Sequence, residues 1–385
     1  MNKNSKLAII FTVVITAIVL SAFTKSSVQT KRTVVVQPKI QAAILLDVSG
    51  SMDGLIEQAK AQLWNMVSTM GKAKCGNDIT PQIEIALYEY GRSTNDVQAG
   101  YVKQLSGFTS DLDSLSKILF SLKTNGGDEY CGHVIKSSLN ELGWDAAPEN
   151  YKVIFIAGNE DFLQGNVKYV DACALAKQKG VIVNTIYCGS RSQGIIEHWN
   201  LLGECGNGSF TNINQNDKID DIPTPYDSLL ITMNGSLNNT YLAYNYTGSA
   251  KLQEVVVVDN MNYKMSKSAA IKRAKVKANS KVYNNATWDL VDAKEKDKNA
   301  IAKLDRAALP DSLQKKSNDE LEKLVEEKAK QRSVAQKQIE ELNAKRDAYI
   351  ATEKAKNATK STSNMETEVE RIIKEQAKRF NMTIQ

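Results

Sequence analysis

The sequence has little histidine and cysteine, and it lacks the short motifs of the common hydrolases and nucleotide-binding enzymes. Its 385 residues include two histidines and five cysteines. No Cys-x-x-Cys pair is present, so the cysteines do not support zinc-ribbon or thioredoxin-like chemistry. There is also no Gly-x-Ser-x-Gly, no His-Glu-x-x-His and no phosphate-binding glycine loop. We therefore expect that the protein is not an enzyme.

An apolar run lies near the N-terminus, from Leu7 to Phe23. Its length falls between that of a signal-peptide core and that of a membrane-spanning helix. We predict that residues 1–25 are a signal peptide or an N-terminal membrane anchor, with a buried core helix as the alternative. Lys3 and Lys6 would keep the N-terminus in the cytoplasm. The body, after a linker over residues 26–38, is then expected in the periplasm, at the cell surface or tethered to the membrane.

Apolar strands alternate with helical patterns between residues 39 and 245. The buried strands are predicted at Tyr151–Ala157, at Val181–Tyr187 and in the run that ends at Asp47, and Tyr226–Tyr244 is predicted as a closing helix. This order predicts an α/β fold with a doubly wound, mostly parallel sheet. Such sheets bind ligands at the carboxyl ends of their strands.

Asp47, Ser49 and Ser51 follow the apolar residues 43–46 directly. They place three hard oxygen donors on one loop at a strand end, where an ordinary turn is the alternative interpretation. Carboxylate and hydroxyl oxygens suit Mg²⁺ first, with Mn²⁺ or Ca²⁺ as alternatives. Gly50 allows the loop to fold back toward the ion.

The Asp-x-Ser-x-Ser pattern after an apolar strand resembles the start of the metal-ion-dependent adhesion site of the von Willebrand factor type A (VWA) family. The resemblance spans about Lys39 to Tyr244 and implies two further metal loops. Asp128 stands where the family usually has a threonine. Asn159 stands where an aspartate is usual, with Glu160 beside it. These departures indicate a divergent bacterial branch.

The resemblance implies a function as well. Asp47 and Asp128 carry the two formal charges of the usual ligand set, which leaves an ion open to a carboxylate from a protein partner. An exported, adhesion-type protein-binding module is therefore our leading hypothesis. If Glu160 also binds, the protein itself supplies more of the ion's ligand shell, which favours a structural ion. Asp128 and Glu160 as solvated loop acids are the remaining alternative.

The cysteines permit two disulfides and one free thiol in an exported chain. Cys188 and Cys205 flank one strand–loop–helix unit and are the predicted pair. Cys75 with Cys131 is a second candidate pair, because both are expected in loops. Cys173 falls at an apolar position of a predicted helix and is expected to fill the core.

The last third of the chain is basic, with 29 lysines and arginines against 21 acids in residues 251–385. We expect a mixed connecting region over 246–310, in which Leu252–Val258 is a strand or an extended segment. A helical region over 311–385 follows, with a flexible linker near 351–364. Its main helix, Asp319–Ile350, is too irregular for a long heptad coiled coil and fits a helical hairpin or a helix lying on a partner. Glu366–Phe380 is predicted to be a last amphipathic helix.

Two other functional hypotheses remain open. In the first, the protein is an envelope structural or assembly protein whose helical region makes the interactions and whose VWA ion is structural. In the second, the acid cluster serves a hydrolase. A basic surface can bind nucleic acid, but most such surfaces are solvated and export argues against it. The oligomeric state cannot be read from the sequence.

Overall fold

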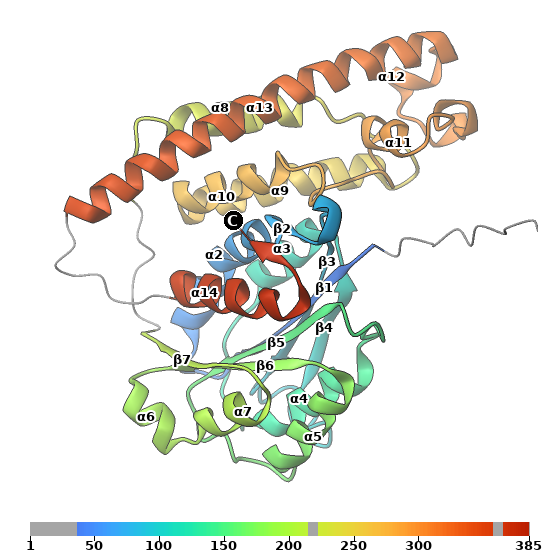
Figure 1. The fold of residues 1–385 in the computed structure, drawn as a ribbon. Helices are drawn as coiled ribbons and strands as arrows, with labels where there is room; N and C mark the ends of the chain where they lie inside the picture. The colour runs from blue at the N-terminus through green and yellow to red at the C-terminus, as the bar shows by residue number, and fades with distance from the viewer. Residues whose placement is uncertain (1–36, 215–221, 357–364, 385) are drawn as a thin grey trace, which may run out of the picture. The chain divides into compact units, whose positions relative to one another are not determined.

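The computed structural model describes residues 37–214, 222–356 and 365–384 (Figure 1). The predicted signal peptide or anchor, and nearly all of the linker after it, lie outside the described residues. Among the helices that are described, none is long and apolar enough to cross a membrane. From Gln37 onward the chain forms one compact unit, and the expected boundaries near residues 245 and 310 fall inside it.

A six-stranded sheet forms the centre of this unit (Figure 1). The strands β3 and β4 are antiparallel, and every other neighbouring pair is parallel. This confirms the predicted mostly parallel, doubly wound sheet. In spatial order the strands are β4 (Lys103–Thr109), β3 (Gln82–Tyr90), β1 (Lys39–Asp47), β5 (Tyr151–Gly158), β6 (Ile182–Cys188) and β7 (Phe210–Ile213).

The central strand β1 is buried on both faces. Ile44 and Leu46 pack into one apolar cluster, whereas Ala43 and Leu45 pack into a second cluster on the opposite face. Successive side chains of a strand point to opposite faces, so a strand that is covered on both sides needs apolar residues at every position. This explains the unbroken apolar run in the sequence.

Helices cover both faces of the sheet (Figure 1). The first face is covered by α2 (Asp53–Met70), α3 (Leu112–Ser121) and α14 (Met365–Ala377). The second face is covered by α4 (Cys131–Glu141), α5 (Tyr169–Lys179) and α7 (Trp199–Cys205), and the short helix α6 (Arg191–Ile196) precedes α7.

The C-terminal helix α14 completes the first face. Val369, Ile372 and Ile373 are at most 1% exposed and belong to the same cluster as the β1 side chains. The buried amide of Gln376 exchanges hydrogen bonds with Asn184 and accepts one from the Tyr151 hydroxyl at 2.9 Å. Beyond the 3₁₀ turn η6 (Lys378–Phe380), strand β8 (Thr383–Ile384) pairs with β2 (Ala73–Lys74). The amphipathic helix predicted at Glu366–Phe380 is thus confirmed, and it belongs to the sheet layers.

The helix predicted at Tyr226–Tyr244 does not close the sheet. The observed helix α8 (Asp227–Asn238) packs its Leu230 and Leu237 against Ile271 and Ile339 of the helical region. The sequence pattern correctly marked a helix with one apolar face, but that face is buried against other helices. The helix that closes the sheet is α14, which begins at Met365, 127 residues after the end of α8.

The region after residue 245 is helical almost throughout. Leu252–Val258 was predicted as a strand or extended segment and instead lies within α9. Val255 and Val258 are one helical turn apart, and both are fully buried, whereas Val256 and Val257 remain exposed. Packing of this one face overrides the β preference of the valine run. The helices are α9 (Gly248–Met265), α10 (Lys267–Lys277), α11 (Leu290–Lys296), α12 (Asp311–Gln314) and α13 (Asn318–Lys356), with 3₁₀ turns η3 (Ile301–Lys303) and η4 (Arg306–Ala308). A further 3₁₀ turn, η2 (Gly76–Asp78), lies in the sheet layers between β2 and β3.

The long helix α13 extends further than predicted. It continues to Lys356, so residues 351–356 of the expected linker are helical, and residues 357–364 lie outside the described part of the chain. Arg332 of α13 is buried and donates to the carboxylates of Asp289 and Asp292 at 2.6 and 2.5 Å. These contacts hold α13 against α11 within the chain itself.

A buried polar cluster joins the helical region to the sheet layers. The indole of Trp64 in α2 donates to Asn262 in α9 at 2.9 Å. Arg273 of α10 is 1% exposed, lies over the Trp64 ring at 4.6 Å, and pairs with Asp113 of α3 at 2.5 Å. The Tyr283 hydroxyl donates to the same carboxylate. Breaking such a buried pair leaves an uncompensated charge, so these contacts tie the two parts of the unit together.

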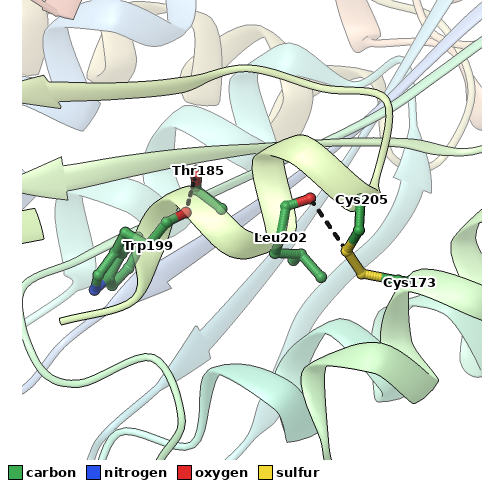
Figure 2. The surroundings of a disulfide bond; sticks show 5 residues. All are labelled: Cys173, Thr185, Trp199, Leu202 and Cys205. Atoms are coloured by element: carbon green, nitrogen blue, oxygen red, sulfur yellow. Dashed lines mark hydrogen bonds between the residues drawn. A yellow bond between two sulfur atoms is a disulfide. The ribbon is translucent and has the colours of Figure 1, made fainter. Parts of the chain in front are cut away.

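The disulfide pairing differs from the prediction. Cys205, at the end of α7, is bonded to Cys173 of α5, with the Cα atoms 5.8 Å apart (Figure 2). Cys188 is a buried free thiol, and Cys75 and Cys131 are free as well. Cys188 belongs to the cluster on the first face of the sheet, whereas Cys205 packs on the second face. The sheet therefore separates the predicted partners, and this side-chain direction is not visible in the spacing of the cysteines.

Candidate metal centre

Asp47 lies at the carboxyl end of β1 and is fully buried. Its Oδ1 accepts a hydrogen bond from the Ser49 backbone N–H at 2.7 Å. Its Oδ2 has no hydrogen-bond partner among the described residues. Burial raises the pKa of this carboxyl to about 6, although the hydrogen bonds from Ser49 lower it. A buried carboxylate oxygen without a partner is costly, unless a cation or a proton satisfies it.

The two serines of the same loop lie beside this carboxylate. Ser49 is 3% exposed, and its Oγ is 3.4 Å from the Oγ of Ser51. The Ser51 hydroxyl donates to Asn159 Oδ1 at 3.3 Å. Asn159 directly follows β5, so the structure brings the predicted first and third loops together. These four predicted residues form one group of oxygen donors.

The second loop contributes a residue that sequence reasoning missed. The segment after α3 is tied to the first loop by the hydrogen bond from Asn125 N to Val48 O at 2.9 Å. Within it Glu129 is 8% exposed and turned inward, whereas the predicted Asp128 is exposed and accepts from the Tyr130 hydroxyl at 3.2 Å. Burial and the negative charges of Asp47 and then Glu160 raise the pKa of Glu129 to about 7.

Gly91, the first residue after β3, allows these groups to approach. Its φ of +80° is a left-handed conformation that favours glycine. A Cβ at this position would lie 2.9 Å from Asp47 Oδ1 and 3.1 Å from Glu129 Cγ. The same point lies close to both residues, so Asp47 and the Glu129 side chain approach each other beside this glycine, and a larger residue there would be strained and would push against both. Only the structure shows this role, because the sequence does not reveal that the β3 end meets the first loop.

The site opens from a buried floor to an exposed rim. Asp47, Ser49 and Glu129 are buried, whereas Ser51 and Glu160 are exposed. The rim is held in place because the Glu160 backbone oxygen accepts from the indole of the fully buried Trp199 at 2.7 Å. The group is therefore reachable from solvent at this rim.

The oxygen donors of this group suit a hard divalent cation that is bound by a mixture of carboxylate, hydroxyl and amide oxygens. In the described part of the chain, no three His, Cys, Asp or Glu side chains gather closely enough to hold a metal ion by themselves. The group instead combines the carboxylates of Asp47 and Glu129 with hydroxyl and amide oxygens. The unpartnered Asp47 Oδ2 supplies the buried charge that such an ion would satisfy.

The sheet order, its antiparallel edge strand and the convergence of these strand-end loops decide the fold. It is the fold of a VWA domain. The Asp-x-Ser-x-Ser loop follows the central strand, and the segments after α3 and β5 adjoin it, as the resemblance implied. In this chain α14 completes the first face of the sheet.

Comparisons with known proteins give only distant likenesses. No family model and no curated protein sequence matches the chain. Among solved structures, the SpRpn10 VWA domain has 14% identity and a TM-score of 0.35, with 48% of this chain and 91% of that chain covered. An aerotolerance-related membrane protein from Bacteroides fragilis has 16% identity and a TM-score of 0.33, with 46% and 93% covered.

Proximal thread matrix protein 1 from the mussel byssus is also similar, in a form described as having a zinc-occupied MIDAS motif. It has 14% identity and a TM-score of 0.33, with 46% of this chain and 42% of that chain covered. The match thus spans less than half of the mussel protein. We assign the VWA fold from the sheet order and the strand-end loops rather than from these likenesses.

Proposed function

We propose that this chain is an exported, cation-dependent protein-binding module. Asp47, Ser49, Ser51, Glu129 and Asn159 would hold the cation, and a carboxylate of a protein partner would complete its shell. The observation that carries the proposal is the buried, unpartnered Oδ2 of Asp47 where the loops converge. The apolar N-terminal segment supports export and tethering to the membrane.

The charges of the site favour a binding role over a catalytic one. Asp47 and Glu129 together balance the two positive charges of Mg²⁺, Mn²⁺ or Ca²⁺, and we expect Mg²⁺ first. A bound ion supplies a Lewis-acidic position that faces the exposed rim and accepts a carboxylate oxygen. The sequence contains no catalytic motif that would use this position for turnover, and we expect no binding of nucleic acid.

Cation binding is tested by thermal unfolding of the wild type and of Asp47→Asn, with Mg²⁺, Mn²⁺ or Ca²⁺ and with EDTA. A ligand at one hundred times its dissociation constant stabilises a protein by about 2.7 kcal/mol. We expect this stabilisation in the wild type and in the control Asp128→Asn, and we expect none in Asp47→Asn. Asparagine keeps the shape of the side chain and removes a buried charge, so the variant should fold without cation. Equal stabilisation of Asp47→Asn would contradict the proposal.

Partner binding is tested by capture from an envelope extract in Mg²⁺ against EDTA. We expect a partner that is retained by the wild type and by Asp128→Asn in Mg²⁺, and that is lost with EDTA or with Asp47→Asn. A partner that ignores both EDTA and the Asp47 substitution would favour the assembly hypothesis.

A groove of about 790 Å³ in the helical region supports that second hypothesis, in which the helical region makes the interactions. The groove lies between α9 and α12, and its lining includes Val256 and Val257, which are 44% and 43% exposed. The assembly hypothesis predicts that Val256→Lys with Val257→Lys abolishes association. Asn260→Lys, on an exposed position of the same helix, should leave association unchanged.

A further inference from the structure

We propose that Glu160 is an internal competitor of the partner: its carboxylate fills the outward position of the bound cation, and the partner's carboxylate displaces it. This inference rests on the proposed function and specifies how the same site is regulated. It concerns a residue whose main chain is fixed at the rim and whose side chain is not.

The position of Glu160 allows this role. The preceding residue, Asn159, accepts from Ser51 at 3.3 Å, and the backbone oxygen of Glu160 accepts from Trp199 at 2.7 Å. The main chain is thereby fixed beside the donor group. The Glu160 side chain is exposed, and its carboxylate has no hydrogen-bond or ion-pair partner in the described ranges.

The neighbouring acid behaves differently. The carboxylate of Asp161 accepts from the Leu163 backbone N–H at 2.9 Å and contacts the His198 ring at 3.0 Å. The Asp161 carboxylate therefore stabilises its own loop. Of the two neighbouring acids, Glu160 is the one whose side chain can rotate toward the site.

Charge balance explains why the two carboxylates would compete. Asp47 and Glu129 already match a divalent ion, so one further carboxylate makes the shell negative and a second one meets strong like-charge repulsion. Burial raises the pKa of both carboxyl groups most, and the negative charge of Glu160 raises the pKa of both further. Among the described residues these three acids do not form a group that could hold a metal ion by itself, so ligation by Glu160 would require its exposed side chain to rotate. A partner acid would then exchange with Glu160 and would not add to it.

The experiment measures water-proton relaxation by Mn²⁺ bound to the full-length chain, which reports the number of water molecules on the ion. Glu160→Ala should weaken Mn²⁺ binding by at least about tenfold and raise the relaxation enhancement per bound ion, because water replaces the lost carboxylate. Acetate should then displace ion-bound water at lower concentration than in the wild type. Glu160→Gln should shift all three measurements in the same direction.

Asp128→Asn is the matched control, since it removes one exposed negative charge from the second loop of the site. It should leave the affinity, the relaxation and the acetate response near wild-type values. If the wild type binds no Mn²⁺, the proposed function itself fails. If the wild type binds Mn²⁺ but Glu160→Ala keeps the same relaxation or the same acetate response, or changes no more than Asp128→Asn, only the competitor role is overturned.

Discussion

Removing the C-terminal helix should unfold the VWA domain, although the helix lies far from it in the sequence. Val369, Ile372, Ile373 and Met382 are each at most 1% exposed in the main core. Burying one such side chain stabilises a fold by about 1.5–3 kcal/mol. The four together contribute about 6–12 kcal/mol, which is comparable with the total stability of a typical domain, about 5–15 kcal/mol. A chain that ends at Lys356 is therefore expected to lose its cooperative unfolding transition.

A single substitution tests the same reasoning in a folded protein. Ile373→Ala removes a fully buried side chain and should lower the free energy of unfolding by about 2–5 kcal/mol. The matched control is Glu375→Ala, an exposed position of the same helix, which should change it by no more than about 0.5 kcal/mol. Urea denaturation followed by circular dichroism measures both. If Ile373→Ala costs no more than the control, α14 does not pack on the sheet as described.

Three further predictions concern buried charges and the disulfide. Arg332→Met leaves Asp289 and Asp292 buried without their cation, so urea denaturation should show a loss of about 3–5 kcal/mol; a loss below 1 kcal/mol would show that the pairs are not formed. Burial and then Asp289 raise the pKa of Asp292 to about 6 in the folded state. The folded state therefore holds the Asp292 proton more tightly than the unfolded chain does. This stabilises the fold fully below the ordinary pKa of about 4, and the stabilisation is lost as the pH rises through 6. Asp292→Asn should flatten the pH dependence of the unfolding free energy in that window, and an unchanged profile would contradict the assignment. Thiol labelling in denaturant without reductant should modify three cysteines and spare Cys173 and Cys205. Cys173→Ser should cost about 3–4 kcal/mol for a loop of 32 residues; labelling of Cys205 in the wild type would overturn the pairing.

The sheet could be predicted from the sequence because its signals are local. A strand that is covered on both faces needs apolar residues throughout, as in β1 and β5, and each such run is a strong pattern by itself. The valine run in α9 shows the limit of the same argument. Four consecutive valines favour a strand by propensity, but only Val255 and Val258 meet the core, and their spacing is that of a helix turn.

The first metal loop could also be predicted, since Asp47, Ser49 and Ser51 are contiguous and a single loop sets their geometry. The inward residue of the second loop could not. Asp128 and Glu129 are adjacent acids, and Glu129 is the one that packs beside Gly91, a neighbour that is distant in the sequence. The direction of Cys188 is a similar case, because neighbouring residues of a strand face opposite sides of the sheet. Such choices depend on contacts between distant segments.

The place of α14 illustrates a more general limit. An amphipathic pattern shows that a helix has an apolar face to bury, but it does not show which surface buries it. Two helices of this chain, α8 and α14, each had a pattern suited to closing the sheet, and α8 comes directly after the last strand. What distinguishes α14 is a polar match: Gln376 hydrogen-bonds to the Tyr151 hydroxyl and to the amide of Asn184, whose oxygen also accepts from the Ser209 backbone N–H. Apolar periodicity is common to both helices, so these buried hydrogen bonds are the contacts of α14 that an apolar pattern does not predict. Gln376→Leu should therefore keep the helix but weaken its preference for this face.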